Sequence, residues 1–283
     1  MRDLILGAVA YDAKVVPIWD GFLAHFRAHG VPFDYVLYSN YERQVAAHLR
    51  GDVDVAWNSP LAWLQAQHAA AAAGRRAHAV AMRDTDRDLT SVILVRAEGG
   101  GGTISGSTAT IADLRGRRVG VGAGDSPQAT LIPLGELAEA GVDVVPVRHD
   151  VLVGKHGDHV GGERDAVKAL LAGAVDAACV IDGNRLAFAR EGLLAPGAVR
   201  VVHQTAPYDH CNMTVLDDGH PATARFVEVL QAMSYDDPVV RPLLDLEGLT
   251  RWLPGRTSGY AALERAVTRD GSLAAWLATV GPR

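Results

Sequence analysis

Two serines stand where they could hold an anion. Ser59 and Ser126 are each followed by proline, and each comes after a run that predicts a buried strand, 53–57 and 118–122. Serine is a favoured helix N-cap and proline a favoured first helical residue, so both positions predict a helix at the carboxyl end of a strand. First-turn N–H groups lack intrahelical acceptors and carry partial positive charge. We therefore expect the two hydroxyls and nearby N–H groups to bind the acidic end of a ligand. These N–H groups belong to Leu61, Gln128, Ala129 and Thr130.

Three histidines and a glutamate are candidates for proton transfer. His156 and His159 lie in a glycine-rich run that predicts a loop, His210 precedes an apolar strand, and Glu163 opens the predicted helix 163–171. Imidazole titrates near neutral pH, so a histidine over a bound ligand could act as a general acid or base. Two alternatives stay open: the loop histidines are solvent-exposed, and Glu163 is a solvated first-turn carboxylate that the helix dipole favours.

The other reactive residues do not form a recognisable motif. His156-x-x-His159 lacks the further ligands that a zinc site needs, so we expect no metal. Cys211 follows His210, but adjacent side chains of a strand point to opposite faces, which argues against a nucleophilic pair. The glycines of the run 120–124 lack the spacing of a dinucleotide-binding motif. We therefore expect no cofactor.

Composition limits the classes of partner. At 283 residues the chain exceeds the usual size of one domain, which favours two lobes. A net charge of −6 without a basic stripe argues against nucleic acid. We also expect no membrane span. The run 4–10 predicts a core strand almost at Met1, with no basic and apolar leader before it, so as it stands the sequence predicts a cytoplasmic protein. If a leader was removed, the protein is periplasmic or extracellular.

Strand and helix patterns alternate along the chain, which predicts an α/β fold with a mostly parallel sheet and helices on both faces. Ser39-x-x-Glu42, for example, has the pattern of a capping box that opens a helix. Ligands of such sheets lie beyond the carboxyl ends of the strands. The residues predicted there are Tyr11, Asn58, Ser59, Asp125, Ser126 and Asp182.

Several stretches together resemble the substrate-binding proteins of phosphate, phosphite and phosphonate ABC transporters, which have a type 2 periplasmic-binding-protein fold. The resemblance rests on the order and spacing of the runs 51–63, 91–96, 111–121, 125–129 and 161–178. It implies an α/β fold of two lobes with mixed sheets, helices on both faces, and an interlobe ligand cleft that closes by hinge motion. The first lobe would be residues 1–90 plus 206–283, and the second residues 91–205.

The resemblance, taken with the strand ends, also implies the ligand contacts. They are Tyr11, Asn58, Ser59, Thr90, Ser91, Asp125, Ser126, Gln128, Ala129, Thr130, Glu163 and Asp182. The chain departs from the family at one helix start, where the usual histidine is replaced by Gly161-Gly162-Glu163. Desolvated carboxylates at Glu163 and Asp125 would repel a phosphonate dianion. A ligand that carries both an acid and an amine would fit them better.

Two functions of different class are therefore expected. The first is a solute-binding protein that holds a small anionic or zwitterionic molecule, phosphonate-like, phosphate-like or carboxylate, and that partners an ABC permease if it is secreted. The alternative is a cytoplasmic enzyme on the same fold, of the dehydratase, decarboxylase or cofactor-biosynthesis type, that uses histidine and carboxylate groups for proton transfer. Fold analogy alone does not separate the two.

Overall fold

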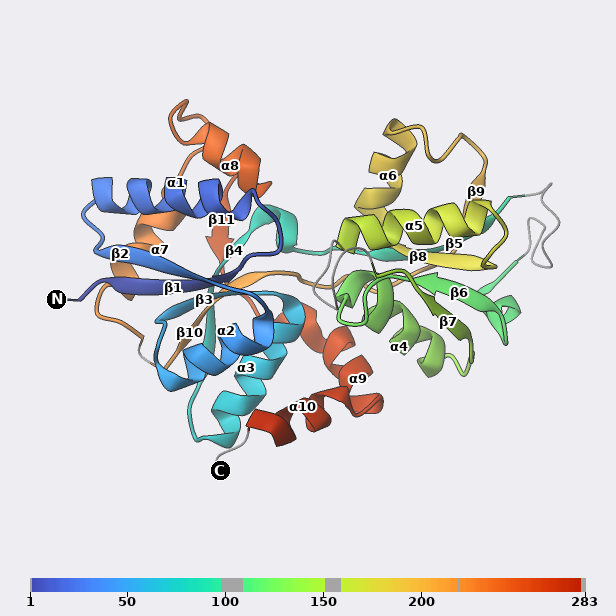
Figure 1. The fold of residues 1–283 in the computed structure, drawn as a ribbon, viewed down its shortest axis with the longest axis horizontal. Helices are drawn as coiled ribbons and strands as arrows, with labels where there is room; N and C mark the ends of the chain where they lie inside the picture. The colour runs from blue at the N-terminus through green and yellow to red at the C-terminus, as the bar shows by residue number, and fades with distance from the viewer. Residues whose placement is uncertain (1, 98–108, 151–158, 218, 281–283) are drawn as a thin grey trace. The chain divides into compact units, whose positions relative to one another are not determined.

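The computed structural model describes residues 2–97, 109–150, 159–217 and 219–280 (Figure 1). The chain divides into two compact units, each with its own sheet. The first comprises residues 1–88, 209–260 and 271–283, and the second residues 89–208 and 261–270. Residues 261–270 thus fall in the second unit, whereas the sequence placed them with the first lobe.

The first unit is built on a six-stranded mixed sheet in the order β11-β4-β10-β3-β1-β2. Its strands are β1 (Leu4–Val9), β2 (Phe33–Tyr38), β3 (Val55–Asn58), β4 (Ala77–Arg83), β10 (Asn212–Leu216) and β11 (Trp252–Pro254). β1 pairs in parallel with β2 and β3, while β10 runs antiparallel to β3 and β4. The antiparallel pairing places the start of β10 beside the end of β4.

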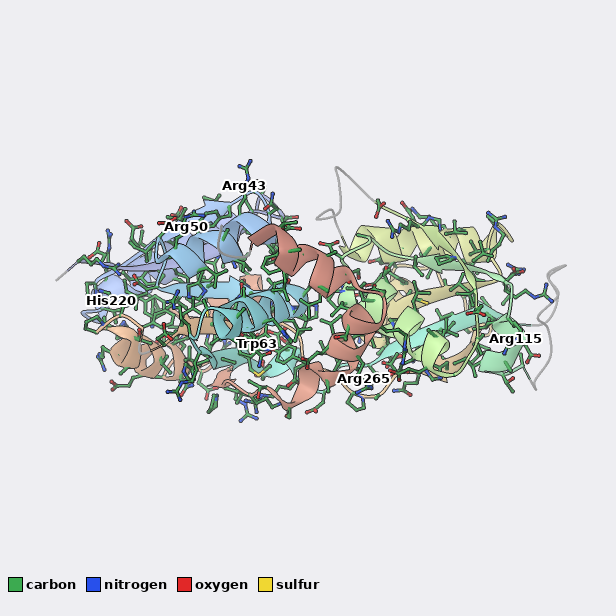
Figure 2. All side chains as sticks on the ribbon, turned by 90° about the horizontal axis from the view of Figure 1, so that it is seen from below. Arg43, Arg50, Trp63, Arg115, His220 and Arg265 are labelled. Atoms are coloured by element: carbon green, nitrogen blue, oxygen red, sulfur yellow. The ribbon has the colours of Figure 1, made fainter. Side chains whose placement is uncertain are left out.

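Helices cover both faces of this sheet (Figure 1). The first face carries α1 (Val15–Ala28), α7 (Thr223–Gln231) and α8 (Arg241–Glu247), and the second carries α2 (Tyr41–Arg50), α3 (Pro60–Ala72) and α10 (Ser272–Val280). The first-face core gathers Phe22 and Phe26 of α1 with Phe226 of α7. The smaller core of the second face holds Val45 and Ala62 with Trp276 packed against it. Charged residues of α2 such as Arg43 and Arg50 are exposed, whereas Trp63 of α3 is buried (Figure 2).

The cap of α2 differs from the prediction. Asn40, not Ser39, is the N-cap, and its side-chain oxygen accepts a hydrogen bond from the Arg43 N–H at 2.9 Å. The predicted capping box from Ser39 to Glu42 is therefore wrong by one residue, because asparagine caps as well as serine and stands one position closer to the helix.

The second unit has a five-stranded mixed sheet in the order β7-β6-β8-β5-β9. Its strands are β5 (Ser91–Arg96), β6 (Arg118–Val121), β7 (Val145–Arg148), β8 (Ala177–Ile181) and β9 (Val199–Gln204). β6 is parallel to β7 and β8, and β5 is antiparallel to β8 and β9. The side chains of β5 alternate between two cores: Val92 and Leu94 face one, Ile93 and Val95 the other.

Helices cover both faces of this sheet. On one face lie α5 (His159–Leu171) and α6 (Asp182–Arg190), and on the other lies α4 (Ile132–Glu139), against which α9 (Ala261–Arg269) packs. α9 approaches α4 closely, since a Cβ atom at Gly135 would lie 2.7 Å from the Cβ of Ala266. Arg265 of α9, labelled in Figure 2, donates to Glu139 at 3.1 Å. Short helical turns complete the fold: η1 (Asp84–Asp86), η2 (Ile111–Leu114), η3 (Pro127–Leu131) and η4 (Ser258–Tyr260). Among the described residues, no helix is both long and apolar enough to cross a bilayer.

Candidate ligand-binding residues

Ser126 opens a helical segment in the second unit, as the sequence predicted. The segment begins as the π-helical turn η3 and continues into α4. The fully buried Ser126 hydroxyl accepts a hydrogen bond from the Ala129 N–H at 3.2 Å, and the Ser126 carbonyl accepts from Thr130 N–H at 3.2 Å and Leu131 N–H at 3.0 Å. Two of the N–H groups predicted to meet a ligand, those of Ala129 and Thr130, are therefore used by the turn itself. The hydroxyl hydrogen of Ser126 has no acceptor among the described residues, so it can donate to a ligand.

Two more polar side chains are buried in this turn. Gln128 is 6% exposed and Thr130 3%, yet Gln128 Oε1 and Thr130 Oγ1 have no hydrogen-bond partner among the described residues. A buried polar group left unpaired costs about 1–3 kcal/mol. A polar ligand at this turn would remove that cost.

Arg148 brings a positive charge to the loop before Ser126. Val121 of β6 and Arg148 of β7 are partners in the parallel register, so the chain that leaves β6 passes beside Arg148. The guanidinium lies against Gly124, where a Cβ atom would stand 3.3 Å from Nη1. A planar guanidinium is well suited to bind an oxyanion. Sequence reasoning missed Arg148, although its place at a strand end was a usable signal.

The first turn of α5 packs against the same loops. A Cβ atom at Gly162 would lie 2.5 Å from the His149 carbonyl oxygen and 3.7 Å from the Cα of Gly122. A Cβ atom at Gly122 would in turn lie 3.0 Å from that of Ala129. His149, which sequence reasoning also missed, has a buried Nε2 without a hydrogen-bond partner among the described residues, and burial lowers its pKa. The glycines thus let three backbone segments meet next to Ser126.

Glu163 is not a solvated carboxylate, so that alternative is wrong. The residue is fully buried, and its Oε2 accepts hydrogen bonds from the Ile181 N–H and the Asn184 side chain, both at 2.9 Å. Glu163 therefore ties α5 to β8 and α6. Asp182, at the start of α6, pairs instead with Arg185 at 2.9 Å.

Ser91 supports the turn at Ser126, whereas its neighbour Thr90 bonds to β9. The buried Ser91 hydroxyl donates to the Gln128 carbonyl at 2.6 Å and lies 2.7 Å from the Tyr208 hydroxyl. It thereby fixes the backbone of η3 to β5. Thr90 accepts a hydrogen bond from Gln204 at 3.1 Å. Asp125, directly before Ser126, is 9% exposed.

In the first unit, Ser59 caps α3 as predicted. Its hydroxyl accepts from the Ala62 N–H at 3.3 Å, with Pro60 as the first helical residue. The preceding Asn58 is fully buried and used internally, since it donates to Thr214 Oγ1 and accepts from Gln44 Nε2, both at 2.8 Å. Asn58 therefore joins β3 to β10 and α2.

Tyr11 is the exposed member of the predicted set in this unit. It follows β1, is 43% exposed, and has the Lys14 ammonium 5.9 Å from its ring centroid. An aromatic face next to a cation offers a ligand both apolar and charged contact.

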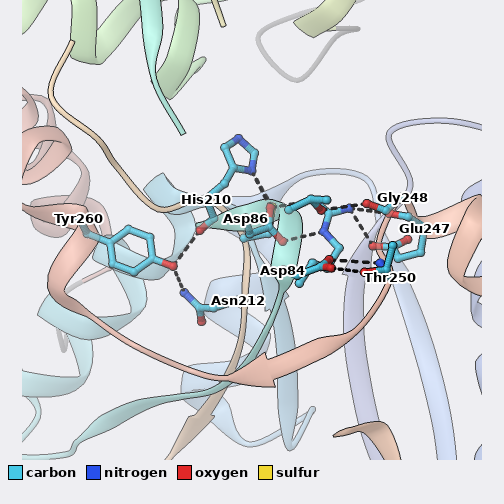
Figure 3. Close-up of polar contacts among 11 residues, drawn as sticks. Asp84, Asp86, His210, Asn212, Glu247, Gly248, Thr250 and Tyr260 are labelled. Carbon is cyan, nitrogen blue, oxygen red and sulfur yellow. Dashed lines mark hydrogen bonds and ion pairs between the residues drawn. The ribbon is translucent and has the colours of Figure 1, made fainter. Parts of the chain in front are cut away.

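A buried ionic network stands at the end of β4 in the same unit (Figure 3). Arg83 donates to both carboxylate oxygens of Asp86, at 2.6 and 2.8 Å, and to Glu247 Oε1 at 3.2 Å. Burial raises the pKa of Glu247 to about 7. Burial has the same effect on Asp86, but the adjacent Arg83 charge outweighs it and lowers the pKa of Asp86 to about 2. One guanidinium thus serves two carboxylates, an arrangement that the charged run 83–88 only hinted at in the sequence.

The predicted acid–base residues are spread over the two units. His210 belongs to the first unit, while Glu163 and His159 belong to the second. His156 lies outside the described residues, and for His159, the first residue of α5, the side chain is not described. The expectation that the His210 and Cys211 side chains point to opposite faces is wrong, because both residues precede β10 and His210 Nδ1 lies 3.1 Å from Cys211 Sγ. Without a metal, burial raises the pKa of Cys211 well above its usual range, which disfavours a nucleophilic thiolate.

Comparison with solved structures defines the class of protein. PhnD1 from Prochlorococcus marinus, solved with methylphosphonate, is 19% identical with a TM-score of 0.67, over 95% of this chain and 98% of that one. XAC2383 from Xanthomonas citri, bound to chloride, is 19% identical with a TM-score of 0.66, over 98% of each chain. The aliphatic sulphonate binding protein SsuA from Escherichia coli is 20% identical with a TM-score of 0.56, over 96% of this chain and 88% of that one. The fold is the type 2 periplasmic-binding-protein fold, as predicted.

The sequence identifies the family within that class. Residues 9–260 match the family of phosphonate ABC transporter periplasmic substrate-binding proteins. The match spans most of the chain, and the chain belongs to this family, which confirms the resemblance noted in the sequence. No curated protein matches the sequence.

Proposed function

We propose that the chain binds a small oxyanion, of phosphonate, phosphate or carboxylate type, and releases it unchanged as the substrate-binding component of an ABC transporter. Membership of the substrate-binding family supports the class of function. The observation that carries the ligand chemistry is the turn at Ser126, with its buried polar side chains beside a guanidinium. The enzyme alternative has no support among the comparisons. We also propose that the chain works with a permease in the periplasm, as its family does.

The anion-binding contacts proposed in the second unit are of three kinds. The Ser126 hydroxyl and Thr130 Oγ1 donate hydrogen bonds, and the first-turn N–H of Gln128 adds a fixed backbone donor. Arg148 supplies full positive charge next to Gly124. Donors already held in place lose little conformational freedom when the ligand arrives, which favours affinity. Glu163, committed to Ile181 and Asn184, acts here as a support.

The candidate contacts that we propose within the first unit are the start of α3 and the exposed ring of Tyr11. Ser59 repeats the serine–proline arrangement of Ser126, and it too keeps a hydroxyl hydrogen to donate. We propose that Asp125 and Asp182 contact an amine when the ligand has one. PhnD1 was solved with methylphosphonate, and SsuA is an aliphatic sulphonate binding protein, so an alkylphosphonate and an alkylsulphonate are the first probes to compare.

Calorimetry on Ser126 variants tests the proposal. Methylphosphonate, an aminoalkylphosphonate, inorganic phosphate, an alkylsulphonate and acetate are titrated into the wild-type chain to find the tightest binder. Ser126→Gly keeps a residue that caps nearly as well but has no hydroxyl. A hydrogen bond to a charged group contributes about 1.5–3 kcal/mol, so that variant should bind the tightest probe about 10–100-fold more weakly. Unchanged affinity would mean that Ser126 is only a cap.

A matched pair of arginine variants tests whether the positive charge of Arg148 contributes to anion binding. Arg148→Gln removes the guanidinium beside Gly124, whereas Arg118→Gln changes an exposed arginine at the opposite end of the same sheet. Affinity should fall for the first variant and stay within about twofold for the second, and the loss should shrink as salt rises. Equal effects in the two would refute a specific role for Arg148. Mass spectrometry of the probe after incubation should show no product, since product would favour the enzyme alternative.

A further inference from the structure

Three side chains of different donor type meet at the end of β4 in the first unit. Asp86 closes the turn η1 that follows β4, and His210 and Cys211 come directly before β10. β10 pairs antiparallel with β4, and the His210 N–H donates to the Asp86 carbonyl at 2.8 Å. The topology therefore fixes the three residues side by side.

The donor atoms of these residues are close enough to share one ion. A carboxylate oxygen of Asp86, a ring nitrogen of His210 and Cys211 Sγ all lie within 4.8 Å of one another. His210 Nδ1 is 3.1 Å from Cys211 Sγ and 3.6 Å from Asp86 Oδ1. Bonds of about 2.0–2.3 Å in a tetrahedral zinc site separate such ligand atoms by about 3.3–3.7 Å. The separations of 3.1 and 3.6 Å from His210 Nδ1 are close to these values, and the third separation is at most 4.8 Å.

The surroundings hold the donors and provide charge balance. The Arg83 guanidinium donates hydrogen bonds to both oxygens of the Asp86 carboxylate. The Tyr260 hydroxyl donates to the His210 carbonyl at 2.8 Å (Figure 3). Partners of this kind orient ligands in metal sites. Glu247, which also binds Arg83, is a second buried carboxylate, so the cluster has two acidic groups for one arginine. The His210 side chain is 20% exposed, which leaves a route for an ion to enter.

From this geometry we infer that Asp86, His210 and Cys211 bind a transition-metal ion of the zinc class. Thiolate and imidazole ligands select Zn²⁺ or Co²⁺ over Mg²⁺ and Ca²⁺, which prefer oxygen. The inference departs from the sequence-based expectation of no metal, because Asp86 was not recognisable as a partner of two residues more than a hundred positions away. It does not depend on the proposed function.

Co²⁺ titration of the chelator-treated, reduced full chain tests the inference. The protein should bind one Co²⁺ with the near-ultraviolet charge-transfer absorption that a cobalt–thiolate bond produces. Cys211→Ser should abolish that absorption, whereas Cys179→Ser, which changes the other buried free cysteine, should retain it. Loss of even an outer partner weakens metal binding about 10–100-fold, so we expect at least that loss of affinity for Cys211→Ser.

Two further measurements keep the test decisive. His25 and His29 form a helix pair with ring centroids 4.2 Å apart, so each titration is repeated with His29→Gln to remove that competing pair. Zn²⁺ should also protect Cys211 from alkylation in the folded wild-type protein, and circular dichroism checks that each variant is folded. Co²⁺ binding without thiolate absorption, absorption that survives Cys211→Ser, or no binding in the wild-type chain would each overturn the inference.

Discussion

His48 should make the first unit sensitive to acid. The residue lies on α2 and is 2% exposed. Its ring interacts with the Asp54 backbone, which raises the pKa less than burial lowers it, but neither ring nitrogen makes a hydrogen bond of good geometry among the described residues. Burial lowers its pKa to about 4 from the 6.5 expected in an unfolded chain. Between these two values the unfolded chain holds a proton that the folded chain does not. Stability should therefore be lost as pH falls below 6.5, and the loss should be complete below 4.

The size of this effect follows from the two pKa values. One pKa unit corresponds to about 1.4 kcal/mol, so the full loss is about 3 kcal/mol, of which about 2 kcal/mol falls between pH 7.5 and pH 5. His48→Leu removes the titrating group and two buried ring nitrogens that lack hydrogen bonds of good geometry among the described residues. It should leave stability at pH 7.5 unchanged or higher, and it should lower the loss between pH 7.5 and pH 5 by about 2 kcal/mol.

Urea unfolding followed by tryptophan fluorescence measures this change in the relevant unit alone, because all five tryptophans belong to the first unit. A chelator in every sample prevents metal binding from changing the measured stability. His78→Leu, which alters an exposed histidine of β4, is the matched control and should keep the wild-type dependence on pH. The reasoning is refuted if His48→Leu loses as much stability in acid as the wild-type chain does.

Two paired comparisons test the other buried contacts. Arg256→Ala removes the guanidinium that binds the fully buried Asp209 carboxylate at 2.7 and 2.5 Å, so the first unit should lose about 3–5 kcal/mol of stability. Arg50→Ala breaks an exposed ion pair and should cost about 1 kcal/mol or less in the same fluorescence assay. Gly259→Ala would place a Cβ atom on the Asp209 carboxylate and should lower the free energy of unfolding by about 1–3 kcal/mol. The Cβ atom of Gly183→Ala would meet nothing within 4 Å, so that variant should be neutral or stabilising. Unfolding followed by circular dichroism measures both. A similar loss for both members of either pair would contradict the packing described above.

Local features were the part of the site that the sequence could predict. The serine–proline pairs at 59 and 126 allowed both helix N-caps to be predicted, because the N-cap preference depends on only about four neighbouring residues. The fold and family followed from the order of several such local signals, and both are confirmed. Even here a near neighbour can compete, as Asn40 did with Ser39 for the start of α2.

Long-range pairing was the part that the sequence could not predict. Asn58 looked like a ligand residue because it ends a strand, yet its hydrogen bonds go to Thr214, which is 156 positions away, and to Gln44. Arg83 likewise donates a hydrogen bond to a second carboxylate, that of Glu247, which is 164 positions away. A polar residue at a strand end has the same sequence signature whether it is free or engaged, and only the register of the neighbouring strands separates the two cases.

The start of α5 is earlier than the sequence predicted. The resemblance implied a histidine at a helix start that the sequence placed at Gly161-Gly162-Glu163, but α5 begins at His159, so the helix opens on a histidine after all. In the structure, Glu163 accepts two hydrogen bonds and fastens α5 to its neighbours, and Gly162 lacks the Cβ that would strike the His149 carbonyl. Arg148, at the end of β7, brings a permanent positive charge to the neighbouring loop, where its guanidinium lies against Gly124. Because a guanidinium stays charged where an imidazole titrates, we expect anion affinity to stay nearly constant between pH 6 and pH 8 for a ligand that does not itself titrate there, such as an alkylsulphonate. A steep fall in affinity for that probe over this range would instead point to His149 as the charged group.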